Sequence, residues 1–143
     1  MEWFPASSEE TKNIGKEITS SLIDGDILLL FGEMGAGKTT LTKGIAEGFG
    51  ITKNVTSPTF GLMHVYEIKD SNIKNLVHID TYRLKDEHEL IAIGAEEYFG
   101  TADTVCIIEW PEKIQGLLAT KKVKKIFLEH VSEEKRKITF ENF

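Results

Sequence analysis

The sequence predicts an α/β fold, with a mainly parallel central sheet, antiparallel additions and helices on both faces. Uninterrupted apolar runs at residues 27–31 (ILLLF) and 105–108 (VCII) are typical of parallel strands that are buried on both faces. Segments of helical character, at residues 8–22 and from about 38 to 48, flank the first of these runs. With 143 residues, the chain has the length of one domain, which is expected to span residues 1–143.

The elements of the first half have recognisable starts and ends. Ser7 or Ser8 is expected to cap the first helix, and a turn at 24–26 leads into the strand at 27–31. Gly48 and Gly50 are expected to end the second helix, and the residues after them have the composition of a loop. Residues 61–68 and 75–80 then predict two strands, antiparallel across the polar turn between them.

The second half continues the alternation of helices and strands. A short helix is expected at 86–93, where Asp86 and Glu89 have the spacing of a capping box. Another helical segment around residues 95–99 precedes the second buried strand, and the chain turns away at Pro111. The segments VKKIFLEH and RKITFENF are expected to be two strands that form a hairpin around the sequence SEEK.

A glycine-rich segment joins the strand at 27–31 to the helix after it. In FGEMGAGKTT, Gly32, Gly37, Lys38 and Thr39 match the pattern GxxxxGK[ST]. In this pattern backbone N–H groups surround a phosphate chain, the lysine reaches the β- and γ-phosphates, and the hydroxyl meets Mg²⁺. The helix that starts near Lys38 adds its unpaired N–H groups and positive dipole end at the same point. The fold is therefore expected to be a three-layer sandwich of the P-loop NTPase type.

Such a phosphate site uses Mg²⁺ only if an acidic residue lies nearby, since this ion takes one or two carboxylates besides phosphate oxygens and water. Asp80 and Glu109 each follow a buried strand. Ligands collect beyond the carboxyl ends of the strands in open α/β sheets, so that either acid could face the loop. Position alone leaves open which of them binds the metal, and whether either is only a surface acid.

Composition and charge exclude several classes of protein. The net charge of −6 opposes direct RNA binding, because non-specific affinity for nucleic acid comes mostly from lysine and arginine. No apolar run approaches the roughly 18 residues of a membrane span, and the N-terminal sequence lacks the basic start of a secretory signal. We therefore expect a cytoplasmic protein that does not cross a membrane. The single cysteine, Cys106, lies in an apolar run and is expected to be a buried, unreactive thiol.

Other chemistries have little support in the sequence. The four histidines are His64, His78, His88 and His130. They lack the spacing of a metal site, and we interpret them as surface or core residues. The chain has no GxSxG or cysteine–histidine arrangement for covalent catalysis, and no NKxD sequence of the kind expected in a GTPase.

Among P-loop enzymes, a small-molecule kinase is the main alternative to an ATPase. Such kinases usually stabilise the transferred phosphoryl group with several basic side chains, whereas the only arginines here are Arg83 and Arg136. A scaffold that binds nucleotide without turnover also remains possible, because the loop pattern indicates binding and says little about hydrolysis.

Four motifs, FGEMGAGKTT, SPTF, HIDTYRL and IIEWPE, occur in this order along the chain. With them the chain resembles the TsaE family, also known as YjeE, over almost its whole length. These proteins are small bacterial P-loop ATPases that are required to form N6-threonylcarbamoyladenosine in tRNA. The resemblance thus implies a Mg²⁺-dependent ATPase that converts ATP to ADP and phosphate.

The resemblance also implies roles for individual residues. The loop positions implied to hold the nucleotide phosphates are Glu33, Met34, Gly35, Ala36, Gly37, Lys38, Thr39 and Thr40. Thr39 and Glu109 are implied to hold Mg²⁺, and Asp80 is implied to support hydrolysis, so that Asp80, Lys38 and Glu109 form the expected catalytic set. Met34 stands at a position where leucine is common in the family.

Three further matches lie outside the phosphate loop. Thr11 and Arg136 match positions associated with the adenine end of the nucleotide. The segment Ser57, Pro58 and Thr59 matches a switch-like loop near the γ-phosphate. Thr81, in HIDTYRL, stands where leucine is common.

The partners implied by the resemblance are TsaB and TsaD. Their complex transfers the threonylcarbamoyl group from an adenylate made by TsaC to the adenosine beside the anticodon. The chain is implied to drive this complex with ATP and to meet tRNA only through it. Because P-loop enzymes gain roughly 10³–10⁵ in rate from an arginine finger, a chain with two arginines is expected to be a weak ATPase that its partners stimulate.

Overall fold

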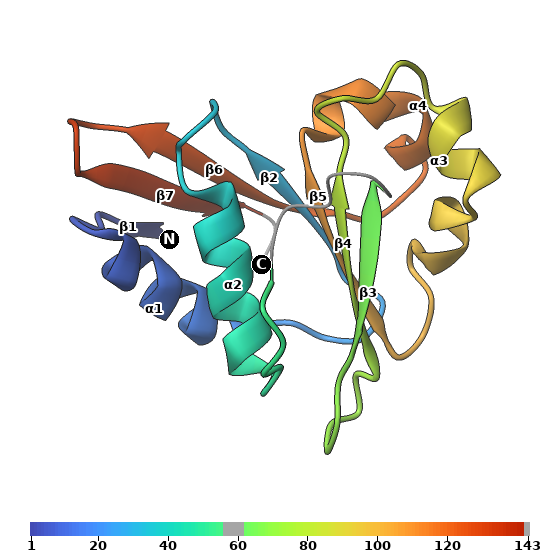
Figure 1. Ribbon diagram of the computed structural model, residues 1–143, viewed down its shortest axis with the longest axis horizontal. Helices are drawn as coiled ribbons and strands as arrows, with labels where there is room; N and C mark the ends of the chain where they lie inside the picture. The colour runs from blue at the N-terminus through green and yellow to red at the C-terminus, as the bar shows by residue number, and fades with distance from the viewer. Residues whose placement is uncertain (56–61, 142–143) are drawn as a thin grey trace.

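A single sheet forms the middle layer of the protein (Figure 1). The computed structural model describes residues 1–55 and 62–141, and within them the strand order is β1-β7-β6-β2-β5-β4-β3. The strands are β1 (Glu2–Trp3), β2 (Ile27–Phe31), β3 (Met63–Glu67), β4 (Asn75–Asp80), β5 (Thr104–Glu109), β6 (Lys124–His130) and β7 (Arg136–Glu141). The two-residue strand β1 was not expected from the sequence, because so short a segment carries no periodicity.

The centre of the sheet is parallel and its edges are antiparallel, as expected. Strands β6, β2, β5 and β4 run in the same direction, whereas β3 pairs antiparallel with β4, and β7 with β6. The register places Leu30, Glu109 and Asp80 side by side at the carboxyl ends of β2, β5 and β4. The carboxyl ends of the buried strands thus meet at one edge of the sheet.

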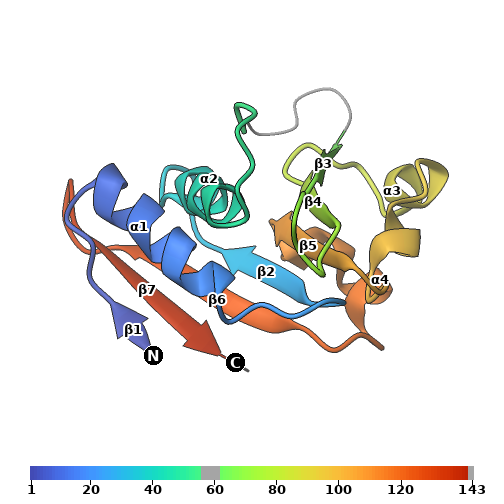
Figure 2. The same cartoon turned by 90° about the horizontal axis from the view of Figure 1, so that it is seen from below.

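Helices α1 (Ser8–Thr19) and α2 (Lys38–Gly48) cover one face of this sheet (Figure 2). Ser7 caps α1, and its hydroxyl accepts a hydrogen bond from Glu10 N at 3.1 Å, as the sequence predicts. The predicted end near Leu22 is wrong by three residues. After Thr19 the backbone hydrogen bonds join residues three apart, such as Leu22 N to Thr19 O at 3.2 Å. This is the pattern of a 3₁₀ turn, which is tighter than an α-helix.

Two glycines allow α1 and α2 to touch through their backbones. A Cβ added to Gly15 would lie 2.5 Å from Leu41 O, and one added to Gly44 would overlap Lys12 O. Helix axes can approach this closely only where no side chain stands between them. This contact fixes α2 against α1 along the sheet.

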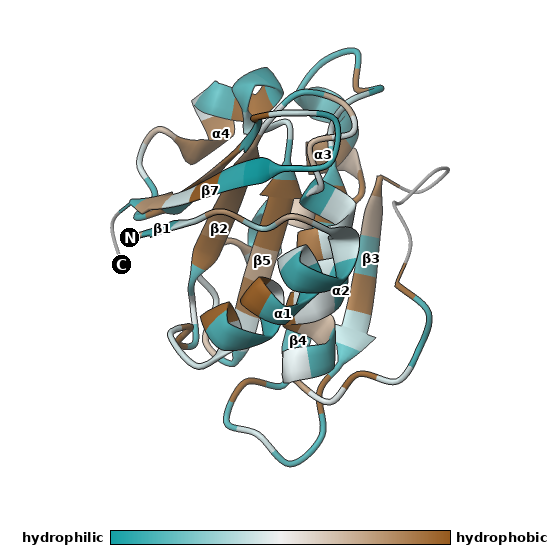
Figure 3. Cartoon of the chain, turned by 90° about the vertical axis from the view of Figure 1, so that its left-hand side faces the viewer, coloured by the Kyte–Doolittle hydropathy of each residue, from teal (hydrophilic) through white to brown (hydrophobic). Residues whose placement is uncertain are grey.

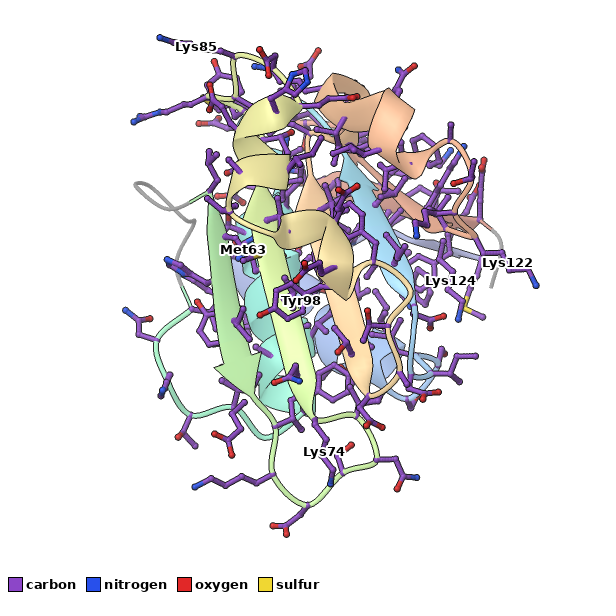
Figure 4. All side chains as sticks on the ribbon, turned by 90° about the vertical axis from the view of Figure 1, so that its right-hand side faces the viewer. Met63, Lys74, Lys85, Tyr98, Lys122 and Lys124 are labelled. Carbon is purple, nitrogen blue, oxygen red and sulfur yellow. The ribbon has the colours of Figure 1, made fainter. Side chains whose placement is uncertain are left out.

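The opposite face is covered by short segments. These are α3 (His88–Ala92), the 3₁₀ helices η1 (Ala95–Tyr98) and η2 (Pro111–Ile114), and α4 (Gln115–Leu118). Figure 4 views this side of the molecule, with Tyr98 over the sheet and Met63 on β3. Helix α4 was not predicted, because a four-residue helix leaves no apolar repeat to detect. The three-layer prediction is nevertheless confirmed.

The predicted cap of α3 is wrong in detail. The helix begins at His88 and not at 86, and the residue at its N-cap, Glu87, makes no side-chain cap bond. Asp86 instead accepts from His88 N at 2.7 Å, while Glu89 accepts from Lys85 N at 3.3 Å. The two acids accept hydrogen bonds from backbone N–H groups near the helix start, as capping residues do. The N–H groups that they pair with differ from those of a capping box.

Each face of the sheet has its own buried core. Leu28, Leu30 and Ile107 point toward α1 and α2, whereas Leu29 and Ile108 point toward the short segments. Figure 3 shows that β2 and β5 are hydrophobic along most of their length, while α1 mixes hydrophobic and hydrophilic residues. Continuous apolar strands and amphipathic helices are what a three-layer fold requires. In the part of the chain that the structure describes, no helix has the length and apolar character needed to cross a membrane.

Candidate nucleotide-binding site

A cavity of about 280 Å³ lies at the edge where β2, β4 and β5 end. Its lining residues come from the glycine-rich loop, from the start of α2 and from the ends of two strands. They are Met34, Gly35, Gly37, Lys38, Thr39, Thr40, Asp80, Tyr82, Glu109 and Trp110. The structure therefore brings together the phosphate loop and both of the acids that the sequence singled out.

The loop between β2 and α2 depends on glycine at several positions. Gly35 and Gly37 have φ angles of 80° and 107°, in the left-handed region that favours glycine. Gly32 is needed for a different reason, since a Cβ there would lie 2.7 Å from Leu128 O on β6. Inside the loop, Ala36 N donates to Glu33 O at 3.1 Å. The bend closes the loop directly over the first turn of α2, whose N–H groups lack partners within the helix.

Lys38 is the basic group of the cavity. The residue is only 5% exposed. Its ammonium donates a hydrogen bond to Gly32 O and lies 3.7 Å from the centre of the Trp110 ring. Burial lowers the pKa of Lys38, while Glu109 and Asp80 act to raise it. The ammonium is thus held between the loop and the Trp110 ring, in a residue that lines the cavity.

Glu109 is the buried acid of the site. The residue is 3% exposed, and its Oε2 accepts from the Thr39 hydroxyl at 3.5 Å, the long limit of a hydrogen bond. The same oxygen lies 2.5 Å from Nε2 of His78, which reaches it from β4. A hydroxyl and a carboxylate therefore meet at the base of the cavity, beside the first turn of α2.

Asp80 lies next to Glu109 in the sheet but is more open to solvent. Its Oδ1 accepts from Tyr82 N at 3.0 Å. Burial is the main cause that raises the pKa of Asp80, the bond from Tyr82 N opposes it, and the neighbouring Glu109 adds to the rise. The two acids thus differ in setting: Glu109 is enclosed by protein donors, and Asp80 faces the cavity rim.

The turn after β5 is held by hydrogen bonds from Thr81, the residue that follows β4. Trp110 has a φ of 60°, an uncommon value for a residue with a large side chain. The Thr81 hydroxyl donates to Glu109 O at 3.1 Å and also to Trp110 O. Thr81 N donates to Glu109 O at 3.2 Å as well. Thr81 therefore ties the end of β4 to the turn that carries Trp110.

The residues present fit a triphosphate and a magnesium ion. The loop offers left-handed glycines and a helix N-terminus, and Thr39 and Glu109 offer the hard oxygen ligands that Mg²⁺ prefers. Within the described residues, no group of three or more histidine, cysteine or acidic side chains could hold a metal. Mg²⁺ at this site would thus depend on phosphate oxygens and water for most of its ligands. The volume lies near the lower end of the roughly 300–1,000 Å³ range of ligand pockets, so that an adenosine group would extend beyond the cavity.

Not every predicted residue lines the cavity. Thr11 is 3% exposed beneath the loop, and its hydroxyl donates to Ser7 O at 3.3 Å. A Cβ on Gly37 would be 3.6 Å from the Thr11 methyl, so the two residues pack together. Arg136 lies on the outer side, with Nη2 3.5 Å from Gly35 O. Both are beside the loop but outside the cavity, and their contact with adenine stays a prediction.

Other predicted positions support the loop or fall elsewhere. Ala36 is fully buried, and neither it nor Glu33 is among the lining residues. Arg83 is exposed and does not line the cavity. The predicted switch-like segment Ser57, Pro58 and Thr59 lies outside the described residues.

Two residues at the site were missed by the sequence reasoning. His78 was interpreted as a surface or core histidine, and Tyr82 was given no role. His78 precedes Asp80 by two residues on one strand, so that the period of two places both on the same face. That pattern could have identified His78. Tyr82 left no comparable signal, because its position depends on the turn after β4.

Comparisons with known proteins identify the family of the chain and a solved structure of the same fold. A family model described as "Threonylcarbamoyl adenosine biosynthesis protein TsaE" matches residues 5–138. The tRNA threonylcarbamoyladenosine biosynthesis protein TsaE of Bacillus subtilis (strain 168) is 40% identical over 140 residues, which cover 98% of this chain and 84% of the relative. The protein of the same name from Treponema pallidum (strain Nichols) is 38% identical over 119 residues, which cover 82% of this chain and 84% of that one. A crystal structure of Bacillus subtilis YdiB matches with a TM-score of 0.79 and 36% identity, and the match covers 98% of this chain and 83% of that chain. The chain therefore belongs to the TsaE family.

Proposed function

We propose that this protein binds ATP with Mg²⁺ and hydrolyses it in the service of threonylcarbamoyladenosine formation in tRNA. The observation that carries the proposal is the convergence, around one cavity, of the phosphate loop, the Lys38 ammonium and two carboxylates from adjacent strands. The names of the family and of the relatives support the tRNA pathway. The site chemistry supports the nucleotide.

The positions of the residues around the cavity assign them different roles in binding and hydrolysis. The loop N–H groups and Lys38 bind the β- and γ-phosphates, because they lie on one side of the cavity and carry positive charge. Thr39 and Glu109 supply oxygen ligands to Mg²⁺, which when bound neutralises charge on the transferred phosphoryl group. Asp80, at the open side, orients the attacking water. Burial raises the pKa of Asp80, which favours a role as proton acceptor for that water.

Turnover by the isolated chain is expected to be slow. Stabilisation of the charge that develops on the γ-phosphoryl group normally requires a second positive side chain besides the loop lysine. Arg136 lies on the outer side of the loop and Arg83 is exposed, so that neither arginine is directed into the cavity. The TsaB–TsaD complex is the proposed partner that completes the site, and tRNA is reached through that complex.

Phosphate release tests the proposal. The isolated protein should release phosphate from ATP slowly in the presence of Mg²⁺, and faster as TsaB–TsaD is added in increasing amounts. Release that stays absent under all conditions would instead favour the nucleotide-binding scaffold. Transfer of phosphate to a small-molecule acceptor would favour the kinase.

Two matched variants separate the proposed roles of the acids. Glu109→Gln removes a ligand charge and should weaken Mg²⁺-dependent ATP binding. Asp80→Asn should keep most of that binding and lose hydrolysis. If titrations show the reverse, with Asp80 controlling metal affinity and Glu109 only turnover, the two assignments must be exchanged.

A further inference from the structure

The buried contact between His78 and Glu109 links the metal site to a neighbouring strand. His78 is 0% exposed and Glu109 is 3% exposed, and Nε2 and Oε2 lie 2.5 Å apart. No sequence pattern assigned a role to His78, and a buried imidazole is costly unless its polar atoms are paired. Within the described residues, its second nitrogen, Nδ1, has no hydrogen-bond partner. The contact with Glu109 is therefore the polar interaction that the structure provides for this ring.

The direction of this hydrogen bond follows from chemistry. A carboxylate oxygen only accepts, so the imidazole must donate through Nε2. His78 comes from β4, where Val77 and Ile79 point into the opposite core, and its ring is enclosed on the side of Leu76 and Ile107. With such neighbours the ring has little room to turn. The donor is consequently fixed in place before any ligand arrives.

The contact selects one oxygen of Glu109. His78 and the Thr39 hydroxyl both meet Oε2, and Oε1 takes no part in either contact. A carboxylate held at one oxygen by a buried donor can rotate little about its last bond. Its other oxygen then keeps a fixed direction, which is how neighbouring groups orient metal ligands in other proteins.

We propose that His78 is a positioning residue that holds the Glu109 carboxylate in the orientation needed to bind Mg²⁺ with the nucleotide. This inference rests on the proposed function, because it presumes that Glu109 binds the metal. It goes beyond that function because it names the group that orients Glu109 for metal binding. His78 itself touches neither metal nor phosphate.

The test uses two amide variants that differ in reach. In His78→Gln the amide nitrogen can occupy nearly the place of Nε2 and donate to Glu109. In His78→Asn the amide is shorter and stops near the place of Nδ1. Both variants keep a polar group in the same pocket, so that a merely structural role would be disturbed by both. His64→Gln is a further control, since His64 faces His78 across β3 and β4 but contacts Tyr66.

The measurement is calorimetric binding of a non-hydrolysable ATP analogue to each full-length variant at a series of Mg²⁺ concentrations and in EDTA. His78→Asn should need about 10- to 100-fold more Mg²⁺ for the same gain in affinity, the usual cost of losing a group that orients a metal ligand. His78→Gln and His64→Gln should need nearly the wild-type amount, and affinity in EDTA should be similar in all of them. Thermal melting in EDTA identifies the folded fraction for each variant.

The outcomes distinguish this inference from the proposed function. If Glu109→Gln loses the Mg²⁺ response while His78→Asn keeps it, Glu109 binds the metal without help from His78, and the positioning role is wrong. Equal losses in the Gln and Asn variants would also overturn it, because the reach of the donor would not matter. If Glu109→Gln responds to Mg²⁺ as the wild type does, the metal assignment itself fails.

Discussion

On one face of the sheet lie α1 and α2, helices of 12 and 11 residues whose backbones touch at Gly15 and Gly44. On the other face lie α3, η1, η2 and α4, each of four or five residues, which contribute buried side chains such as Leu90, Ala95 and Ile114 to the second core. The first face carries the phosphate loop at the start of α2. The helix whose N-terminus must be aimed at the cavity is thus the one fixed by backbone contact, where no side-chain rotamer can adjust its position. In the described part of the chain, the short segments on the second face pack against the same sheet without such a backbone contact.

The largest expected effect concerns how easily each face opens. Cys106 points to the short-segment face, where its thiol donates to Tyr98 O at 3.4 Å, and burial raises its pKa to about 12. Alkylation requires the thiolate, so native Cys106 should react at least about 10³-fold more slowly than in unfolded protein. Val105, the preceding residue, points to the α1–α2 face. A Val105→Cys, Cys106→Ala variant should be protected still more strongly, because short segments open with less free energy than the whole fold.

Iodoacetamide labelling at low denaturant, compared with global unfolding measured by circular dichroism, checks this difference. Equal labelling free energies for the two thiols would mean that both faces open only with the whole protein. The contrast between the layers would then be one of geometry alone.

The contact between α1 and α2 can be broken by a single methyl group. In Gly44→Ala the new Cβ meets the Lys12 carbonyl, which is backbone and cannot move aside cheaply, so the free energy of unfolding should fall by about 1–3 kcal/mol or more. Gly116→Ala, on the other face, is the matched control. There the Cβ would lie 2.8 Å from Glu87 Oε2, the end of a flexible side chain. Urea unfolding should show a much smaller change for this variant, and equal losses would contradict the comparison.

Lys38→Ala should separate binding from stability. Loss of a charged phosphate contact typically costs about 1.5–3 kcal/mol, so that ATP affinity should fall roughly 10- to 150-fold. Because burial lowers the pKa of Lys38, removal of the ammonium should not lower the free energy of unfolding much. Lys122→Ala removes the same charge from an exposed position shown in Figure 4 and should change neither quantity. Calorimetry and urea unfolding give both values, and an unchanged affinity for Lys38→Ala would refute the phosphate role.

The smallest expected effect is a pH-dependent gain in stability for Asp80→Asn. Burial raises the pKa of Asp80 in the folded protein, so its favourable contribution is present below the unfolded pKa, about 3.9, and is lost as pH rises through the folded value. Asparagine stays neutral and can still accept from Tyr82 N. The variant should therefore be modestly more stable than wild type at pH 7, with no difference at pH 3, when both are unfolded by urea in EDTA. A variant that is less stable at pH 7 would show that the carboxylate makes a favourable contact.

The difference between the faces also explains how far sequence reasoning could go. Uninterrupted apolar strands, the glycine-rich loop and the acids at strand ends are local signals, and they predicted the layers and most of the cavity. The α1–α2 contact depends on Gly15 and Gly44, which lie on different helices far apart in sequence, and no local pattern predicts a backbone contact between them. Helix α4 and strand β1 are too short to show a period. His78 and Thr81 act through residues about 30 positions away, His78 on Glu109 and Thr81 on Glu109 and Trp110, so that their roles become visible only when β4 and β5 are paired.

Gly32 O and the Trp110 ring hold the Lys38 ammonium, and they would compete for it with a phosphate bound in the cavity. A cation over an aromatic ring is stabilised by roughly 0.5–2 kcal/mol, and a phosphate that takes the ammonium must first exceed that amount. The same contact is regained when product leaves, so release is favoured by as much as binding is weakened. For the proposed nucleotide, we expect this competition to favour release over tight retention. The ring that receives the lysine follows directly after the Glu109 carboxylate, so exchange of nucleotide should also change the fluorescence of Trp110.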